Sequence, residues 1–117
     1  MSATWPEPLI RRVADDVLVA AEEEGEPLYF SDIASLACQL TGRDDGPEVW
    51  NLAVEATARL LRDGRLVAGS YARPHGWQPW DGTAADHVRR IRDAVAELAA
   101  AARPLYPGDV CAMVSKT

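Results

Sequence analysis

Residues 56–80 are the stretch of this sequence that most constrains the fold. Gly64 can adopt the left-handed conformation that closes a helix, and the helical pattern ends there. The residues after it favour a pleated strand: Leu66, Val67 and Tyr71. Pro74 suits the first central position of a tight turn, and Gly76 suits its fourth position. The stretch therefore predicts the end of a helix followed by an antiparallel hairpin that ends at Trp80.

Helical periodicity accounts for most of the remaining chain. Apolar residues recur at spacings of three and four, and residues suited to start or stop a helix flank each periodic segment. The predicted helices cover residues 4–24, 31–41, 47–63 and 83–102. Thr4 and Glu7 form a predicted capping box for the first helix, and Ser31 and Thr83 are the predicted N-caps of the second and fourth. Residues 27–30 are predicted to form a short extended piece that pairs with the hairpin.

These elements predict a mainly α fold with a small antiparallel β-hairpin or three-stranded sheet. Their order is that of a winged helix-turn-helix with an added C-terminal helix. A single domain over residues 1–102 is expected, and residues 103–117, with two prolines and a glycine, are predicted to form a mobile tail. The predicted core residues are Val13, Val17, Ile33, Leu36, Val49, Ala53, Leu60, Leu61, Val88, Ile91 and Val95.

Composition and charge narrow the functional classes. The 117 residues carry a formal net charge of -6, which opposes general binding to nucleic acid because phosphate contacts supply most non-specific affinity. No segment is long and apolar enough to span a bilayer, and the first residues lack the pattern of a secretion signal. A cytoplasmic protein is therefore expected, with Cys38 reduced and packed.

The charges are distributed unevenly along the chain. Residues 1–27 contain seven acidic residues and two arginines, whereas residues 58–92 contain seven arginines and three acidic residues. The hairpin end of the molecule is therefore the end that can meet an anion.

The exposed face of the helix over residues 47–63 is the first candidate binding surface. Its predicted side chains are Glu48, Asn51, Glu55, Arg59 and Arg62. An asparagine can read adenine and a glutamate can accept from cytosine, but base contacts need phosphate contacts around them. The first half of this face offers two carboxylates and no basic residue. Glu55 and Arg59 are expected to pair with each other one turn apart.

The hairpin is the second candidate surface. Arg73 and His75 lie at its predicted tip, where a phosphate or an acidic partner would meet them. Trp77 and Trp80 are expected to pack on the first turns of the last helix and on the end of the helix over 47–63. The apolar positions of the last helix have coiled-coil-like spacing, which fits either a core-facing helix or a homodimer seam.

No catalytic, metal or cofactor site is predicted. His75 and His87 are the only histidines, and no other metal ligands lie near them at suitable spacing. The sequence contains no glycine-rich phosphate loop and no nucleophile motif. A non-enzymatic protein is therefore expected.

Two stretches resemble known proteins. The run A-T-A-R-L-L-R-D-G-R-L-V-A-G, which begins at Ala56, resembles the recognition-helix end and wing entry of winged-helix repressors of the PadR and MarR type. Those repressors dimerise and bind DNA. The pattern L-L-R-D-G-R-L-V-A-G, G-W-Q-P-W-D-G-T and R-R-I is similar to a group of small actinobacterial proteins with no assigned role. Some small acidic proteins of this sort lie beside toxins as immunity factors.

The sequence leads to two functional hypotheses. The first is a non-enzymatic winged-helix-like domain that binds a protein partner, as an immunity or regulatory factor, and the net charge and the acidic helix face favour it. The alternative is a DNA-binding transcriptional regulator that uses the hairpin, which the order of elements and the arginines of residues 58–92 favour.

Overall fold

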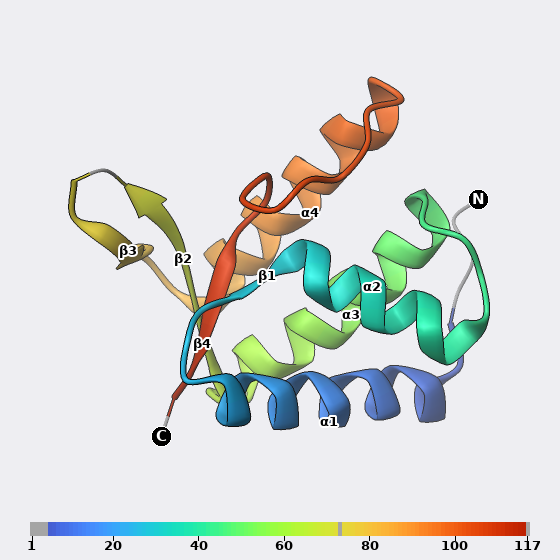
Figure 1. Ribbon diagram of the computed structural model, residues 1–117, viewed down its shortest axis with the longest axis horizontal. Helices are drawn as coiled ribbons and strands as arrows, with labels where there is room; N and C mark the ends of the chain where they lie inside the picture. The colour runs from blue at the N-terminus through green and yellow to red at the C-terminus, as the bar shows by residue number, and fades with distance from the viewer. Residues whose placement is uncertain (1–4, 73, 117) are drawn as a thin grey trace.

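The structure, a computed structural model, describes residues 5–72 and 74–116. The elements are α1 (Glu7–Glu24), β1 (Leu28–Tyr29), α2 (Phe30–Thr41), α3 (Pro47–Arg62), β2 (Leu66–Ala72), β3 (Gly76–Pro79), α4 (Ala84–Ala100) and β4 (Ala112–Ser115), as Figure 1 shows. The predicted class, mainly α with a small antiparallel sheet, is confirmed. No helix within the described residues is long and apolar enough to cross a membrane.

Glycines stop three of the helices, and Gly42, whose φ is 69°, does so for α2. α1 follows the N-cap residue Pro6 and ends at Gly25, whose φ of 67° is left-handed. The predicted cap at Thr4 lies outside the described residues. The chain leaves α3 through Gly64, which has a φ of 71°. Because glycine has no Cβ, it adopts this conformation without steric cost, and the predicted helix stop before the hairpin is confirmed.

Thr83 caps α4 as predicted. Its hydroxyl accepts from the Asp86 N–H at 3.2 Å, and the Asp86 carboxylate accepts from the Thr83 N–H at 2.9 Å. The prediction that Ser31 caps α2 is wrong, because α2 begins one residue before it. Asp32 takes the capping role instead, since its carboxylate accepts from the Tyr29 N–H at 3.1 Å.

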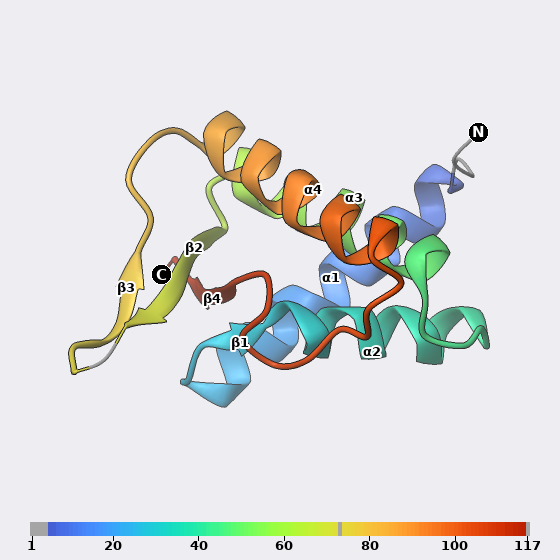
Figure 2. The ribbon, with the colours of Figure 1, turned by 90° about the horizontal axis from the view of Figure 1, so that it is seen from above.

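α3 is the central helix of the fold. It packs against α1, α2 and α4, and Figure 2 shows α4 running along it. Its buried residues are Val49, Trp50, Leu52, Ala53, Val54, Ala56, Thr57, Ala58, Leu60 and Leu61. All the predicted core residues are buried except Leu36, which is half-buried. A helix buried on so many sides keeps only a narrow exposed strip.

The apolar stripe of α4 is used within the chain. Val88, Ile91, Val95 and Leu98 are buried in the same core as α3. Of the two alternatives for this stripe, the structure shows the core-facing helix. A second copy of the chain has no access to these side chains.

The C-terminal segment supplies a central strand of the sheet. The strand order is β1-β4-β2-β3, and β4 pairs antiparallel with both β1 and β2. The prediction that residues 103–117 form a mobile tail is therefore wrong. The prolines and glycine only shape the connection from α4 back to the sheet (Figure 1), whereas the apolar run Val110–Met113 after them is buried. Burial of that run fixes the segment.

The winged-helix arrangement is not confirmed. Residues 27–30, predicted to pair with the hairpin, provide β1, and β4 separates this strand from the hairpin. α4 lies along α3 and leaves little of that helix exposed.

Candidate functional site

Neighbouring elements bind the acidic residues predicted on the exposed face of α3. Glu48 pairs with Arg43, which lies in the turn before α3, at 2.8 Å. Glu55 accepts from the Arg92 guanidinium of α4, also at 2.8 Å. Both carboxylates therefore have partners within the chain.

Arg59 pairs with Glu7 in the first turn of α1. Its Nη2 donates to Glu7 Oε2 at 2.7 Å, and its Nη1 donates to the other carboxylate oxygen. The hydrogen bond from Arg59 lowers the pKa of the Glu7 carboxyl and raises the pKa of Arg59. The predicted pair between Glu55 and Arg59 is wrong, because α1 and α4 flank α3 and each supplies a counter-charge.

Trp5, just before α1, contacts α3. Sequence reasoning missed this contact. Its indole Nε1 donates to the backbone oxygen of Glu48 at 3.1 Å. The Arg43 guanidinium lies 5.0 Å from the centre of the Trp5 ring, within range of a cation–π interaction. No periodic pattern in the sequence indicates this contact, because Trp5 precedes the first helix.

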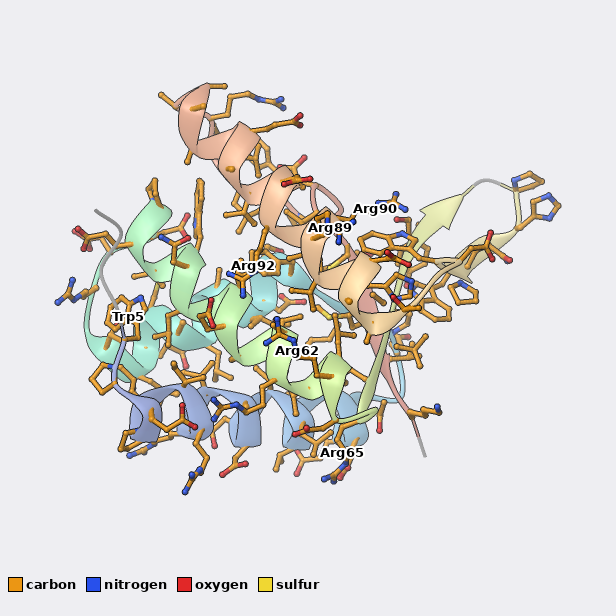
Figure 3. The ribbon with its side chains drawn as sticks, turned by 180° about the vertical axis from the view of Figure 1, so that it is seen from behind. Trp5, Arg62, Arg65, Arg89, Arg90 and Arg92 are labelled. Atoms are coloured by element: carbon orange, nitrogen blue, oxygen red, sulfur yellow. The ribbon has the colours of Figure 1, made fainter. Side chains whose placement is uncertain are left out.

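Arginines line one side of the α3–α4 pair. The Glu55–Arg92 ion pair joins the two helices. Arg62 lies two turns after Glu55, and Arg89 lies one turn before Arg92, so both lie on the side of this ion pair (Figure 3). None of the ion pairs between described residues involves Arg62 or Arg89.

The hairpin meets α4 through Trp80. The Trp80 and His87 rings lie edge to face with centroids 5.7 Å apart, and the Arg90 guanidinium lies 3.8 Å from the Trp80 ring centre. The expected packing of Trp80 on the first turns of α4 is therefore confirmed. His75 is exposed near the hairpin tip, whereas Arg73 lies outside the described residues.

Trp77 packs on the sheet, so the prediction that it packs on α4 is wrong. Its indole Nε1 donates to the Ala112 backbone oxygen in β4 at 2.9 Å, which places the ring across β2. Gly69 makes room for the ring, because a Cβ there would lie 2.6 Å from it. Because Gly69 has no side chain, the Trp77 ring can lie flat on the sheet.

The strand register separates two faces of the sheet. Buried residues on one face join the helical core: Leu28, Leu66, Ala68 and Met113. We call the opposite surface the outer sheet face, and its side chains are Tyr29, Val67, Tyr71, Trp77 and Val114. Figures 1 and 2 show the β2–β3 hairpin projecting away from the helices.

Aromatic rings dominate the outer sheet face. Tyr71 is 50% exposed, and Tyr29 and Trp77 are half-buried. The Tyr29 and Tyr71 ring centroids lie 5.8 Å apart. Desolvation raises the pKa of Tyr71, and the neighbouring Tyr29 and Glu26 raise it further. The Tyr71 hydroxyl therefore stays protonated and can donate a hydrogen bond at neutral pH.

A hollow of about 450 Å³ opens between the start of α3 and the end of α4, and we call it the α3–α4 hollow. Its lining includes Pro47, Trp50, Leu98, Ala99, Arg103 and Pro104. A smaller hollow of about 180 Å³ shares Pro47 and Ala99 with it and is lined by Asn51. The predicted site residue Asn51 thus lies in the seam between two helices and is half-buried there.

Neither cysteine thiol is activated, and the described residues contain no cluster of metal ligands. Burial raises the pKa of the Cys111 thiol to about 12 and also raises the pKa of Cys38, so neither thiol is activated as a nucleophile. Within residues 5–72 and 74–116, no group of three or more His, Cys, Asp or Glu side chains is placed to hold a metal ion.

Comparison with known proteins adds no relative. The chain matches no protein-family description, no curated protein and no solved structure.

Proposed function

We propose that this chain is a non-enzymatic domain that binds a protein partner on its outer sheet face. The observation that carries the proposal is the cluster of Tyr29, Tyr71 and Trp77 on the outer sheet face, where Tyr71 is 50% exposed. Tyrosine and tryptophan are enriched in protein interfaces because each covers a large area while few side-chain rotations are lost.

The outer sheet face is held in shape before any partner arrives. Trp77 is fixed by its hydrogen bond to Ala112 and by the close approach of Gly69. The strands beneath it pair continuously from β1 to β3. A rigid aromatic surface loses little conformational entropy on binding, which favours affinity.

The exposed face of α3, the first surface predicted from the sequence, supports the proposal because it is poorly suited to reading DNA. Glu48, Glu55 and Arg59 on α3 already have ion-pair partners in the chain, and most of α3 is buried. To read a DNA groove, a helix needs an exposed face with free polar side chains. α3 offers little of either.

Site-specific photo-crosslinking tests the protein-binding proposal. A benzophenone amino acid in place of Tyr71 should give an adduct of one discrete mass when the protein is expressed in its own host. Tyr106 is a matched control, because it is a tyrosine of similar exposure, 59% against 50%, outside the outer sheet face. The same probe at position 106 should not give that adduct.

Two crosslinking results would count against protein binding at this surface. One is an identical set of adducts from positions 71 and 106, which would indicate random encounters. The other is an adduct at position 71 that nuclease treatment removes, because this would identify the partner as nucleic acid.

DNA binding is the second candidate function, favoured by Arg62 and Arg89 beside the α3–α4 pair. A duplex held there by phosphate contacts should dissociate as the salt concentration rises. Fluorescence anisotropy with random-sequence and promoter duplexes at low and high salt tests this. Binding that weakens in the Arg62→Gln and Arg89→Gln variants would support it, and the absence of binding at low salt would exclude it.

A further inference from the structure

We propose that the α3–α4 hollow is a binding site for a small amphipathic monoanion, such as a carboxylic acid with an aromatic or aliphatic body. The proposal concerns a different surface from the outer sheet face and does not depend on protein binding. It rests on the shape of the hollow, on Arg103 in its lining and on the strained backbone at its edge.

The hollow has the size and walls of a ligand site. Its volume of about 450 Å³ lies within the range of about 300–1,000 Å³ that small-molecule pockets occupy. Trp50 is only 3% exposed, so its indole forms a fixed wall rather than a mobile flap. Leu98, Pro47 and Pro104 complete an apolar lining. Such a lining suits the apolar body of a ligand.

One arginine of the lining can bind an anionic head group. Arg103 lies in the lining, and none of the ion pairs between described residues uses it. Asp45 supplies the opposing charge, so the lining is formally neutral. Its Oδ1 accepts from the Trp50 Nε1 at 2.7 Å, which holds this carboxylate against the Trp50 wall. A ligand carboxylate therefore finds its counter-charge in Arg103.

The N-terminus of α3 adds a second positive contribution to that of Arg103. Gly46 is the N-cap residue of α3 and lines the hollow, and it has no side chain to accept from the first backbone N–H groups of the helix. The start of α3, with the positive end of its helix dipole, therefore lies beside the hollow that Arg103 also lines. Glu48 also lies in the first turn, but its carboxylate is paired with Arg43 at 2.8 Å.

A strained residue positions Arg103. Ala102 has a φ of 52° and is the one non-glycine residue with positive φ in the described chain. This conformation lets the Arg103 N–H donate to the Leu98 oxygen at 3.0 Å, which closes α4 and turns the arginine into the lining. Left-handed backbone at a non-glycine residue is costly and is often found at binding sites.

A matched pair of dyes tests the proposal. The anionic probe is 8-anilinonaphthalene-1-sulfonate, and the neutral probe is N-phenyl-1-naphthylamine, which has the same aromatic body without the sulfonate. Fluorescence titration should show one site per folded chain with a preference for the anionic dye. Decanoate should displace that dye if the site accepts a carboxylate.

Two variants locate the site. Arg103→Gln should weaken binding of the anionic dye about tenfold and leave the neutral dye unchanged, since a charged hydrogen-bond partner is lost. Arg12→Gln is the matched control, because Arg12 is an exposed arginine of α1 that does not line the hollow, and this change should affect neither dye. Ala99→Phe fills both hollows and should weaken both dyes.

Some results would overturn the proposal outright. Equal binding of the anionic dye to the Arg103→Gln variant and the unmodified protein would show that Arg103 does not bind the anionic head group. Failure of the unmodified protein to bind either dye would remove the hollow as a ligand site. Because Arg103 is exposed, its variant should retain the native circular dichroism spectrum, so a misfolded variant does not confuse the outcome.

Discussion

α3 and the outer sheet face have exchanged the roles that their sequences suggest. α3 carries polar residues at helical spacing, which the sequence suggests as a binding face, yet the structure buries most of this helix and pairs Arg59 with α1 and Glu55 with α4. The outer sheet face carries Trp77, which the sequence predicts to pack on the last helix, yet this ring lies on the sheet beside Tyr71, which is 50% exposed.

The difference shows what decides whether a polar helix face is available for binding. Glu55 and Arg59 are four residues apart, and a helix considered alone would pair them. Two further helices bring Glu7 and Arg92 to within hydrogen-bonding distance, and both residues of α3 then bind across helix boundaries. Availability is therefore a property of the packing around the helix and not of the helix alone.

The largest expected effect lies in α3. Leu60→Ala should lower the free energy of unfolding by about 2–5 kcal/mol, because it leaves a cavity beneath a helix that three others contact. Urea unfolding followed by circular dichroism measures the loss. An unchanged midpoint would mean that this side of α3 does not face the core. The contrast between a buried α3 and an exposed outer sheet face would then be wrong.

Gly69→Ala tests how the outer sheet face is built. The added Cβ meets the Trp77 ring at 2.6 Å and approaches the Gln78 backbone oxygen, so the ring must leave the sheet or the strands must separate. We expect a loss of about 1–3 kcal/mol in unfolding free energy, as for other overpacked sites. The crosslink at position 71 should also weaken. Near-native stability with unchanged tryptophan fluorescence would contradict this packing.

Local signals in the sequence predict the helices and the hairpin well. Gly64, Pro74 and Thr83 act within a few residues of themselves, and the structure confirms the helix stop, the hairpin and the cap of α4. β4 could not be predicted in this way. The prolines and glycine before it indicate a loop, and only pairing with β1 and β2, which are far away in sequence, gives residues 112–115 a place in the sheet.

The candidate site was less predictable for the same reason. Leu66, Val67 and Tyr71 indicate a strand in the sequence, but which face each side chain occupies depends on pairing with β4. The α3–α4 hollow joins residues about sixty positions apart, from Asp45 to Arg103, and no local pattern connects them. The arginine excess of residues 58–92 did indicate a positively charged surface, although Arg59 and Arg92 are paired within the chain.

Thr83→Ala tests the cover that α4 places over α3. Removal of the hydroxyl leaves the Asp86 N–H without its cap, which should cost about 0.5–2 kcal/mol. Hydrogen exchange should speed up in the first turn of α4, and amides in the middle of α3 should change less. Asp86→Ala is a second variant, since it removes the carboxylate that accepts from the Thr83 N–H. Equal stability of all three proteins would show that this cap does not hold α4 on α3.

The smallest expected effect on stability belongs to Tyr71, the residue on which the proposed function depends most. Its side chain is half exposed, so Tyr71→Ser should change the unfolding free energy by only about 0.5 kcal/mol, the usual range for surface substitutions. Tyr106→Ser provides the control for loss of an exposed tyrosine. Urea unfolding should place the two variants together, whereas partner binding, measured once crosslinking has identified the partner, should fall only in Tyr71→Ser. A stability loss as large as that of Leu60→Ala would make Tyr71 a structural residue, and the outer sheet face would then resemble α3 rather than contrast with it.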